Sequence, residues 1–359
     1  MLRNIVMSKS TFKKLEDLKA RKSDLLLNEA VLSKSFSKAE LPENVRYVFE
    51  SMRKIDTEYT LKTYDEAKRV ENQIRNGVEA SVSFEYQGSV PLDIHIRIHS
   101  DLDILTINED FVSLEPPQKA SNPYTGDPVA ELRNLRKSIN SKLSSSFPNA
   151  NVDNSKAKAI AISGGSLQRK FDIIICNWYK TVSDEKAIKI YDKENDLRVE
   201  DYTFTHMAVV NQKANQVFND NYRRIIRLLK NLKADADEKI NLSSFLITSI
   251  MFHMSDLDFY VEYRNSTKLL VNASKHLAKV IENRPYRMTL DSPNGREKLF
   301  FDDEQGKIQE VKKLKKELDE TIELLAIEIK QNSGNLNESY RMFSVGNSFE
   351  TLEKADFNY

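Results

Sequence analysis

The spacing of hydrophobic positions changes twice along the chain. From Ser8 to about Gly77, apolar residues recur every three or four positions, which predicts long amphipathic helices with a fresh start at Pro42. The pattern then has period two, which predicts β-strands. The predicted strands cover 80–89, 100–107, 157–163, 169–179 and a hairpin over 186–201. One helix, 128–147, interrupts them, and helical spacing returns from residue 202.

These changes predict four parts and an α+β fold. N-terminal helices over 1–78 pack on both lobes, an α/β core with a mixed sheet covers 79–201, and an α-helical lobe covers 202–331. A polar tail over 332–359 is rich in Asn, Ser and Gly, and we expect it to be loosely held.

Composition and charge limit which partners and which cellular compartment the protein suits. The 359 residues suit two lobes, and 54 basic side chains balance 54 acidic ones, so bulk charge gives no basic coat for nucleic acid or a membrane surface. A single cysteine, Cys176, excludes an intramolecular disulfide. No apolar run approaches the ~18 residues that a membrane span needs, and residues 1–10 lack a signal-peptide core. We therefore expect a cytoplasmic protein that is not itself a membrane protein.

Three aspartates provide candidate chemistry. Asp101 and Asp103 are separated by one residue in a strand, so their side chains share a face. Two carboxylates this close repel each other unless a cation lies between them. Asp172 lies in the strand "FDIII", where an unpartnered charge is costly. The three carboxylates predict a site for two Mg²⁺ ions, with Mn²⁺ as an alternative, although the pair could also be the polar edge of a surface hairpin.

A Gly-Ser pair about a dozen residues upstream supplies a second half of the same chemistry. Gly88 lets the backbone approach a ligand closely, and the backbone N–H groups of the loop and the hydroxyl of Ser89 can bind phosphate oxygens. Metals beside them would activate an attacking hydroxyl and neutralise a leaving pyrophosphate.

The order "GS", "SDLD", "FDIII" resembles the polymerase-beta-like nucleotidyltransferases, and within them the cGAS-like, CD-NTase branch of bacterial antiphage defence. The segment "HMAVVNQKANQVFNDNYRRIIRLLKNLK" is similar to the helical half of that branch. The resemblance covers roughly residues 80 to 300 and implies a polymerase-beta-like core. By position, it implies triphosphate binding by Gly88 and Ser89, catalytic metal binding by Asp101, Asp103 and Asp172, and phosphate or base contacts by Arg227 and Lys230. Arg227 and Lys230 could equally be the solvated edge of a helix.

These motifs constrain the product less than the reaction, since enzymes with this fold transfer nucleotides to many different acceptor molecules. The overall plan also resembles the nucleotidyltransferase of the Hailong antiphage system. That resemblance implies template-independent synthesis of an oligodeoxyadenylate signal, with dATP or ATP as preferred substrate, and a membrane effector as partner. It also implies initiation on a protein tyrosine, for which Tyr359 is the primer candidate. This is the preferred hypothesis.

Two alternatives stay open. One is a CBASS-type synthase that releases cyclic oligonucleotide second messengers. The other is a non-catalytic interaction protein on a degenerate nucleotidyltransferase core. The charged helix predicted over 303–331 is compatible with partner binding or formation of a homo-oligomer, although such a helix is usually a solvated face. The intact aspartates argue against degeneration.

Overall fold

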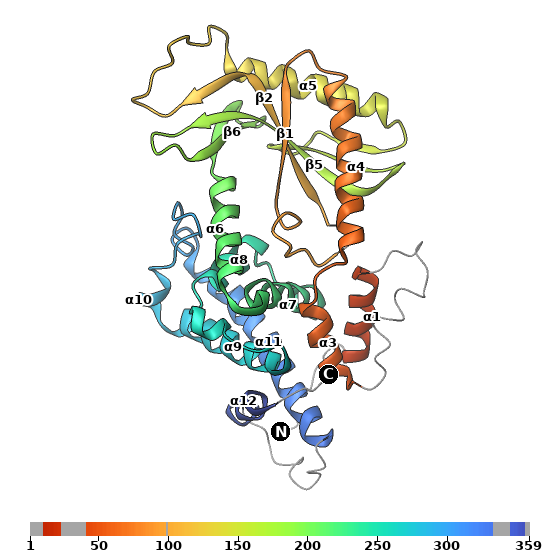
Figure 1. Cartoon of the computed structure of the whole chain (residues 1–359), viewed down its shortest axis with the longest axis vertical. Coiled ribbons are helices and arrows are strands. Elements are labelled where there is room, and N and C mark those ends of the chain that lie inside the picture. The colour runs from red at the N-terminus through yellow and green to blue at the C-terminus, as the bar shows by residue number, and fades with distance from the viewer. Residues whose placement is uncertain (1–9, 23–40, 98–99, 333–344, 356–359) are drawn as a thin grey trace. The chain divides into compact units, whose positions relative to one another are not determined.

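The computed structural model describes residues 10–22, 41–97, 100–332 and 345–355 (Figure 1). The chain forms two compact units, a sheet unit over 55–209 and a helical unit that combines 1–54 with 210–359. The expected α+β class, with a mixed sheet and an α-helical C-terminal lobe, is confirmed. Among the described residues, no helix has a stretch long and hydrophobic enough to span a bilayer.

The sheet unit contains seven strands and three helical segments. Its strands are β1 (Val82–Gln87), β2 (Leu102–Leu114), β3 (Asn151–Asp153), β4 (Ala159–Gly164), β5 (Leu167–Lys180), β6 (Lys186–Asp192) and β7 (Leu197–Asp201). Its helices are α4 (Thr57–Arg75), α5 (Pro128–Ser146) and the first part of α6 (Thr203–Gln216). Helix α5 begins where the sequence predicts, because Asp127 accepts hydrogen bonds from the N–H groups of Val129 and Ala130.

The sheet is built around the long strand β5. Its order is β1-β2-β5-β4-β3, while β6 pairs with the second half of β5 and β7 pairs with β6. Strands β2 and β5 are parallel, and all other pairs are antiparallel. The mixed topology therefore brings the segments around Asp103 and Asp172 side by side, although they are far apart in the sequence.

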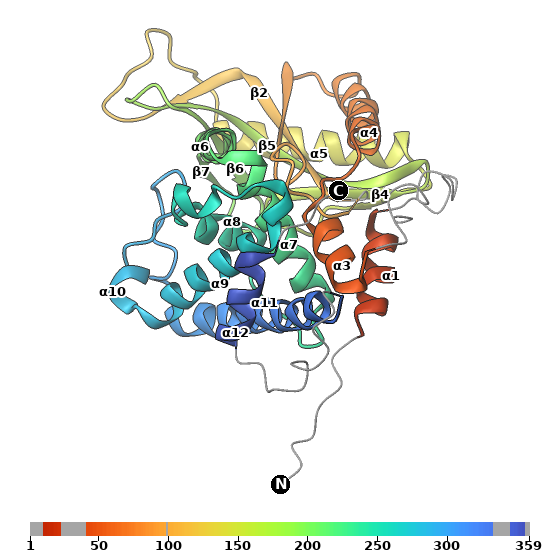
Figure 2. The same ribbon diagram turned by 60° about the horizontal axis from the view of Figure 1, so that its bottom comes forward.

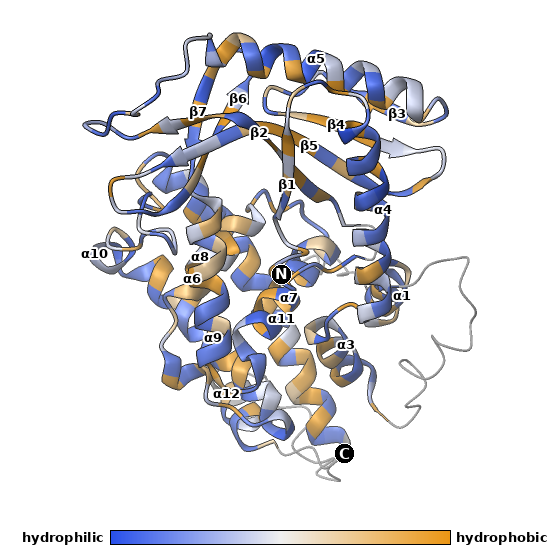
Figure 3. Ribbon diagram, turned by 45° about the horizontal axis from the view of Figure 1, so that its top comes forward, coloured by the Kyte–Doolittle hydropathy of each residue, from blue (hydrophilic) through white to orange (hydrophobic). Residues whose placement is uncertain are grey.

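Alternation along β2 and β5 gives the sheet two different faces. One face packs on α4 and α5, which Figure 2 shows beside the strands. Its buried strand residues include Leu102, Ile104, Phe171, Ile173 and Ile175. The other face carries Leu105, Ile107, Ile174, Cys176 and Ile188, with Trp178 and Phe204 packed against them. Within the sheet, Figure 3 shows hydrophobic residues along β4 and β5.

The helical unit is assembled from both ends of the chain. Its helices are α1 (Thr11–Lys22), α3 (Glu43–Met52), the rest of α6, α7 (Asn221–Asp235), α8 (Ser244–Phe252), α9 (Ser266–Glu282), α10 (Arg284–Arg287), α11 (Glu304–Asn332) and α12 (Val345–Lys354). Helix α7 lies in the interior of this unit, with Ile225, Leu228, Leu229 and Leu232 buried.

Two details differ from the sequence pattern. The helical pattern that begins at Pro42 is interrupted between Met52 and Thr57, where extended backbone at Arg53 separates α3 from α4. The tail is not uniformly loose, because α12 packs on α9 and α11 (Figure 2). Leu352 of α12 is fully buried, and its carbonyl oxygen accepts a hydrogen bond from Thr267.

Candidate active site

Asp103 and Asp172 lie directly opposite each other on neighbouring strands. They are register partners in the parallel pair β2–β5, whose strands are about 4.8 Å apart. Each has buried apolar neighbours in its strand, Leu102 and Ile104 for Asp103, and these side chains point to the face covered by α4 and α5. Both carboxylates therefore point to the opposite face of the sheet, as the alternation of "SDLD" predicts.

The charge of Asp103 is only partly compensated by the described residues around it. Burial, followed by repulsion from the Asp172 carboxylate, raises the pKa of Asp103 to about 6. Gln87, its register partner on β1, donates a hydrogen bond at 3.3 Å and opposes the rise in pKa. The Oε1 atom of Gln87 is buried and has no hydrogen-bond partner in the part of the chain that the structure describes. Such an arrangement favours a cation beside Asp103.

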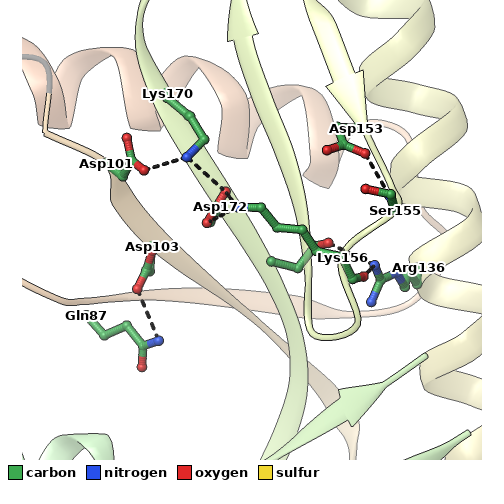
Figure 4. Close-up of polar contacts among 10 residues, drawn as sticks. Gln87, Asp101, Asp103, Arg136, Asp153, Ser155, Lys156, Lys170 and Asp172 are labelled. Carbon is green, nitrogen blue, oxygen red and sulfur yellow. Dashed lines mark hydrogen bonds and ion pairs between the residues drawn. The ribbon is translucent and has the colours of Figure 1, made fainter. Parts of the chain in front are cut away.

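Two lysines neutralise the other carboxylates (Figure 4). Lys156 Nζ donates to both oxygens of Asp172, at 2.8 and 2.6 Å. Lys170 Nζ donates to Asp101 and lies 3.9 Å from Asp172. The hydrogen bond with Asp101 raises the pKa of Lys170. We call the three aspartates, Asp101, Asp103 and Asp172, the acidic cluster. Lys156 and Lys170 lie against it and form ion pairs with two of its carboxylates.

The loop that carries Lys156 is fixed by a buried arginine. Arg136 of α5 is 2% exposed, and its guanidinium donates to Asn154 Oδ1 and to the carbonyl oxygens of Lys156, Ala157 and Ala159 at 2.6–2.8 Å. Lys193 adds a hydrogen bond from its side chain to the carbonyl oxygen of Asn154. The backbone at Lys156 therefore has little freedom, whereas its side chain is 39% exposed and can rotate.

Gly88 and Ser89 immediately follow β1, next to Asp103. Gly88 has φ +95°, and a Cβ atom there would lie 3.5 Å from Asp103 Oδ2. The positive φ favours glycine, whereas a Cβ atom there would only reach ordinary van der Waals contact with Asp103. The carbonyl oxygen of Ser89 accepts from the N–H of Ile94, which closes a turn. The predicted phosphate loop and the aspartates are therefore brought together.

The donor set fits a divalent cation. Asp103 and Asp172 share one face of two neighbouring strands, Asp101 immediately precedes β2 and acts electrostatically on Asp103, and oxygen atoms are the ligands that Mg²⁺ and Mn²⁺ prefer. In the described part of the chain, however, no three His, Cys, Asp or Glu side chains are already arranged to hold a metal. The lysines account for this, since Asp101 and Asp172 are directed to ammonium groups. A metal would have to replace those contacts.

Arg227 and Lys230 lie on α7, in the helical unit. Arg227 is 3% exposed, donates to the carbonyl oxygen of Met52 and forms an ion pair with Asp220 at 3.0 Å. Lys230 is 7% exposed, and burial lowers its pKa to about 8, with nearby Lys233 contributing. Neither side chain lies on a solvated helix edge. Their nucleotide contacts remain a prediction, and Tyr359 lies outside the described residues.

Comparisons with known proteins match both units. The model of the cGAS/DncV-like nucleotidyltransferase C-terminal helical domain matches residues 209–323. The chain is 34% identical to the cyclic dinucleotide synthase CdnE of Yersinia aleksiciae, over 71% of this chain and 70% of that one. It is 32% identical to a c-di-GMP synthase of Lachnospiraceae bacterium strain RUG226, over 74% and 85%. The structure of the STING-associated CdnE c-di-GMP synthase of Capnocytophaga granulosa superposes with a TM-score of 0.75 at 27% identity, covering 87% of this chain and 97% of that one.

These relatives correct the preferred product. The prediction of oligodeoxyadenylate synthesis primed on Tyr359 is wrong, because relatives that match most of the chain are named as synthases of cyclic dinucleotides. The error has a physical cause. The aspartates and the Gly-Ser loop determine how an α-phosphate is attacked, and both reactions share that chemistry. The choice of acceptor rested on the terminal phenol and the Hailong resemblance.

Proposed function

Because the chain belongs to the CD-NTase family of cGAS/DncV-like nucleotidyltransferases, we propose that it makes a cyclic dinucleotide signal in antiphage defence. Family membership confirms the expected enzyme class, a nucleotidyltransferase. The observation that carries the proposal is the pairing of Asp103 with Asp172 beside Gly88. The proposed substrate is GTP and the proposed product is c-di-GMP, as the names of two of the relatives suggest.

The proposed reaction consists of two similar steps. A ribose hydroxyl oxygen of one nucleotide attacks the α-phosphate of the other, a new P–O bond forms, and the bond to pyrophosphate breaks. Repeating the step within the linear intermediate closes the ring and releases a second pyrophosphate. Asp101, Asp103 and Asp172 would hold Mg²⁺ or Mn²⁺, which supplies hydroxyl activation and charge neutralisation. The loop at Gly88 and Ser89 would hold the triphosphate through N–H and hydroxyl donors.

The proposed product also defines the proposed partner. The Capnocytophaga granulosa relative is described as STING-associated. We infer that the cyclic dinucleotide made by this chain is read by a separate effector with a receptor domain for such ligands.

The direct test incubates the purified protein with each ribonucleoside and deoxyribonucleoside triphosphate, singly and in pairs, with Mg²⁺ or Mn²⁺. Products are identified by mass spectrometry after phosphatase treatment. We expect GTP alone to give a phosphatase-resistant product with the mass of c-di-GMP. Asp103→Asn should lower the rate by two or more orders of magnitude, because a metal ligand is lost. Linear products only, or equal activity of Asp103→Asn, would contradict the proposal.

A further inference from the structure

The ammonium group of Lys156 lies where a cation bound to Asp172 would lie. It contacts both carboxylate oxygens within 2.8 Å, which is the bidentate face of that side chain (Figure 4). We propose that Lys156 is a built-in counter-ion that competes with the divalent metal for Asp172 and so sets the metal concentration at which the site fills. This inference rests on the proposed function, since it takes the acidic cluster to be the metal site.

The backbone of Lys156 is held in place by the residues around its loop. Three hydrogen bonds from the buried Arg136 go to the carbonyl oxygens of Lys156, Ala157 and Ala159, and a fourth goes to Asn154 Oδ1. Lys193 donates to the carbonyl oxygen of Asn154, so the backbone is held on both sides of Lys156. Asp153 accepts a further hydrogen bond from the N–H of Ser155. Because the backbone is fixed, the root of the side chain stays in one place relative to Asp172. Displacing the ammonium group requires only rotation about the flexible stem, and the loop need not move.

The balance of charge explains why a competing cation is useful. Asp101, Asp103 and Asp172 bring three carboxylates together, and without metal they repel one another. Lys156 and Lys170 supply two positive charges, so the metal-free acidic cluster and these two lysines together have one net negative charge when all five groups are ionised. The same contacts keep the carboxylates from facing one common point, which agrees with the absence of a ready metal arrangement in the described residues.

Competition has a measurable consequence. Any metal that binds Asp172 must first break the ion pair with Lys156. The free energy of metal binding is therefore less favourable by the free energy of that ion pair. The lysine side chain is 39% exposed and the aspartate 18% exposed, so the pair is screened but not fully solvated. Removing the ammonium group should therefore tighten metal binding about two- to fivefold, the ratio that a partly exposed ion pair corresponds to.

The test measures Mn²⁺ binding to the full chain without nucleotide, by electron paramagnetic resonance and by calorimetry at low salt. Lys156→Met should tighten binding about two- to fivefold. Lys156→Arg keeps the charge and should bind Mn²⁺ like the unaltered chain. Lys158→Met is the matched control, because it removes an equal charge from an exposed residue of the same loop, and it should change affinity less than Lys156→Met.

The outcomes separate this inference from the proposed function. Equal or weaker Mn²⁺ binding by Lys156→Met, with loss of binding in Asp103→Asn, overturns the role of Lys156 and leaves the metal site intact. Unchanged Mn²⁺ binding in Asp103→Asn overturns the metal site and this inference with it. A gain of equal size in Lys158→Met also overturns the inference, since the effect would then reflect net charge and no specific contact.

Discussion

Asp103 is a residue whose charge destabilises the metal-free fold. Its pKa is about 6 in the folded protein and lies near 3.8 in an unfolded chain, so the native state binds more protons between these values. Stability is therefore highest at low pH within this window and falls as pH rises through 6. The loss by pH 7 is at most about 3 kcal/mol.

This shift predicts an unusual effect of Asp103→Asn. In a chelator at pH 7, the variant should have a larger free energy of unfolding than the unaltered chain, because it removes a buried charge that faces Asp172. The difference should shrink towards pH 4, where Asp103 is protonated anyway. Urea denaturation at several pH values measures it. Asp153→Asn is the contrasting control, since hydrogen bonds from Ser155 lower the pKa of Asp153 and no gain is expected. A gain for Asp103→Asn that does not depend on pH would refute the explanation.

Gly88 is the second residue with a sharp expectation. Gly88→Ala places a Cβ atom at φ +95° and 3.5 Å from Asp103 Oδ2. We expect a loss of about 1–2 kcal/mol of stability and a fall in the rate of product formation on the order of tenfold or more. Gly164→Ala is matched in backbone cost, at φ +79°, but its Cβ would meet no atom within 4 Å. It should lose comparable stability and keep its activity, and equal losses of activity in both would argue against a role for the Gly88 loop.

At the scale of elements, hydrophobic periodicity predicts most of the sheet. Strands such as 169–179 were predictable because one face of β5 packs on α4 and α5 while the other is also covered, which gives a strongly apolar run. The break between α3 and α4 was not predictable from the sequence, because Ile55 at the break is buried and so continues the helical spacing of apolar residues. Helix α12 was also missed, since its polar composition hides the burial of Leu352. The domain boundaries at 78 and 201 remain a prediction.

The aspartates of the candidate site were predictable, but the groups that control them were not. Asp103 and Asp172 stand out because charges are rare among apolar strand residues. Lys170 carried a usable signal, because it lies two residues before Asp172 and must share its face. Lys156 and Arg136 carried none, since a lysine in a polar loop and an arginine on an amphipathic helix are usually solvated. Only the tertiary fold brings Arg136 onto the loop of Lys156.

Arg136 therefore gives a prediction about a whole loop. Arg136→Met removes four hydrogen bonds from a buried guanidinium, and we expect a loss of about 3 kcal/mol or more of stability. Amide hydrogen exchange should accelerate most in residues 154–159. Arg133→Met, on the same helix, removes an exposed ion pair with Asp196 and should cost much less stability than Arg136→Met. Uniform acceleration over the whole sheet unit would contradict a local role for Arg136.

At the scale of the whole molecule, the helical unit depends on residues from both ends of the chain. Lys14 of α1 pairs with Glu317 of α11, and Glu328 of α11 accepts hydrogen bonds from the N–H groups of Asn44 and Val45 at the start of α3. The N-terminal helices α1 and α3 are thus structural parts of the unit that includes the family-matched segment 209–323. If α1 and α3 did not pack on this unit, their polar groups would be solvated and would not pair with residues of α11.

Asp235 tests this dependence at one position. It is 1% exposed, forms two hydrogen bonds with the Arg21 guanidinium at 2.6 and 2.7 Å, and accepts a third from Tyr47 at 2.8 Å. Asp235→Asn leaves the Arg21 charge, itself largely buried, without its carboxylate, and should cost about 3–5 kcal/mol. Thermal unfolding and hydrogen exchange in α1, α3 and α7 measure the effect. Glu238→Gln, which removes an exposed pair with Lys313, should cost much less stability than Asp235→Asn. If both variants unfold alike, α1 is not anchored through Arg21 and Asp235.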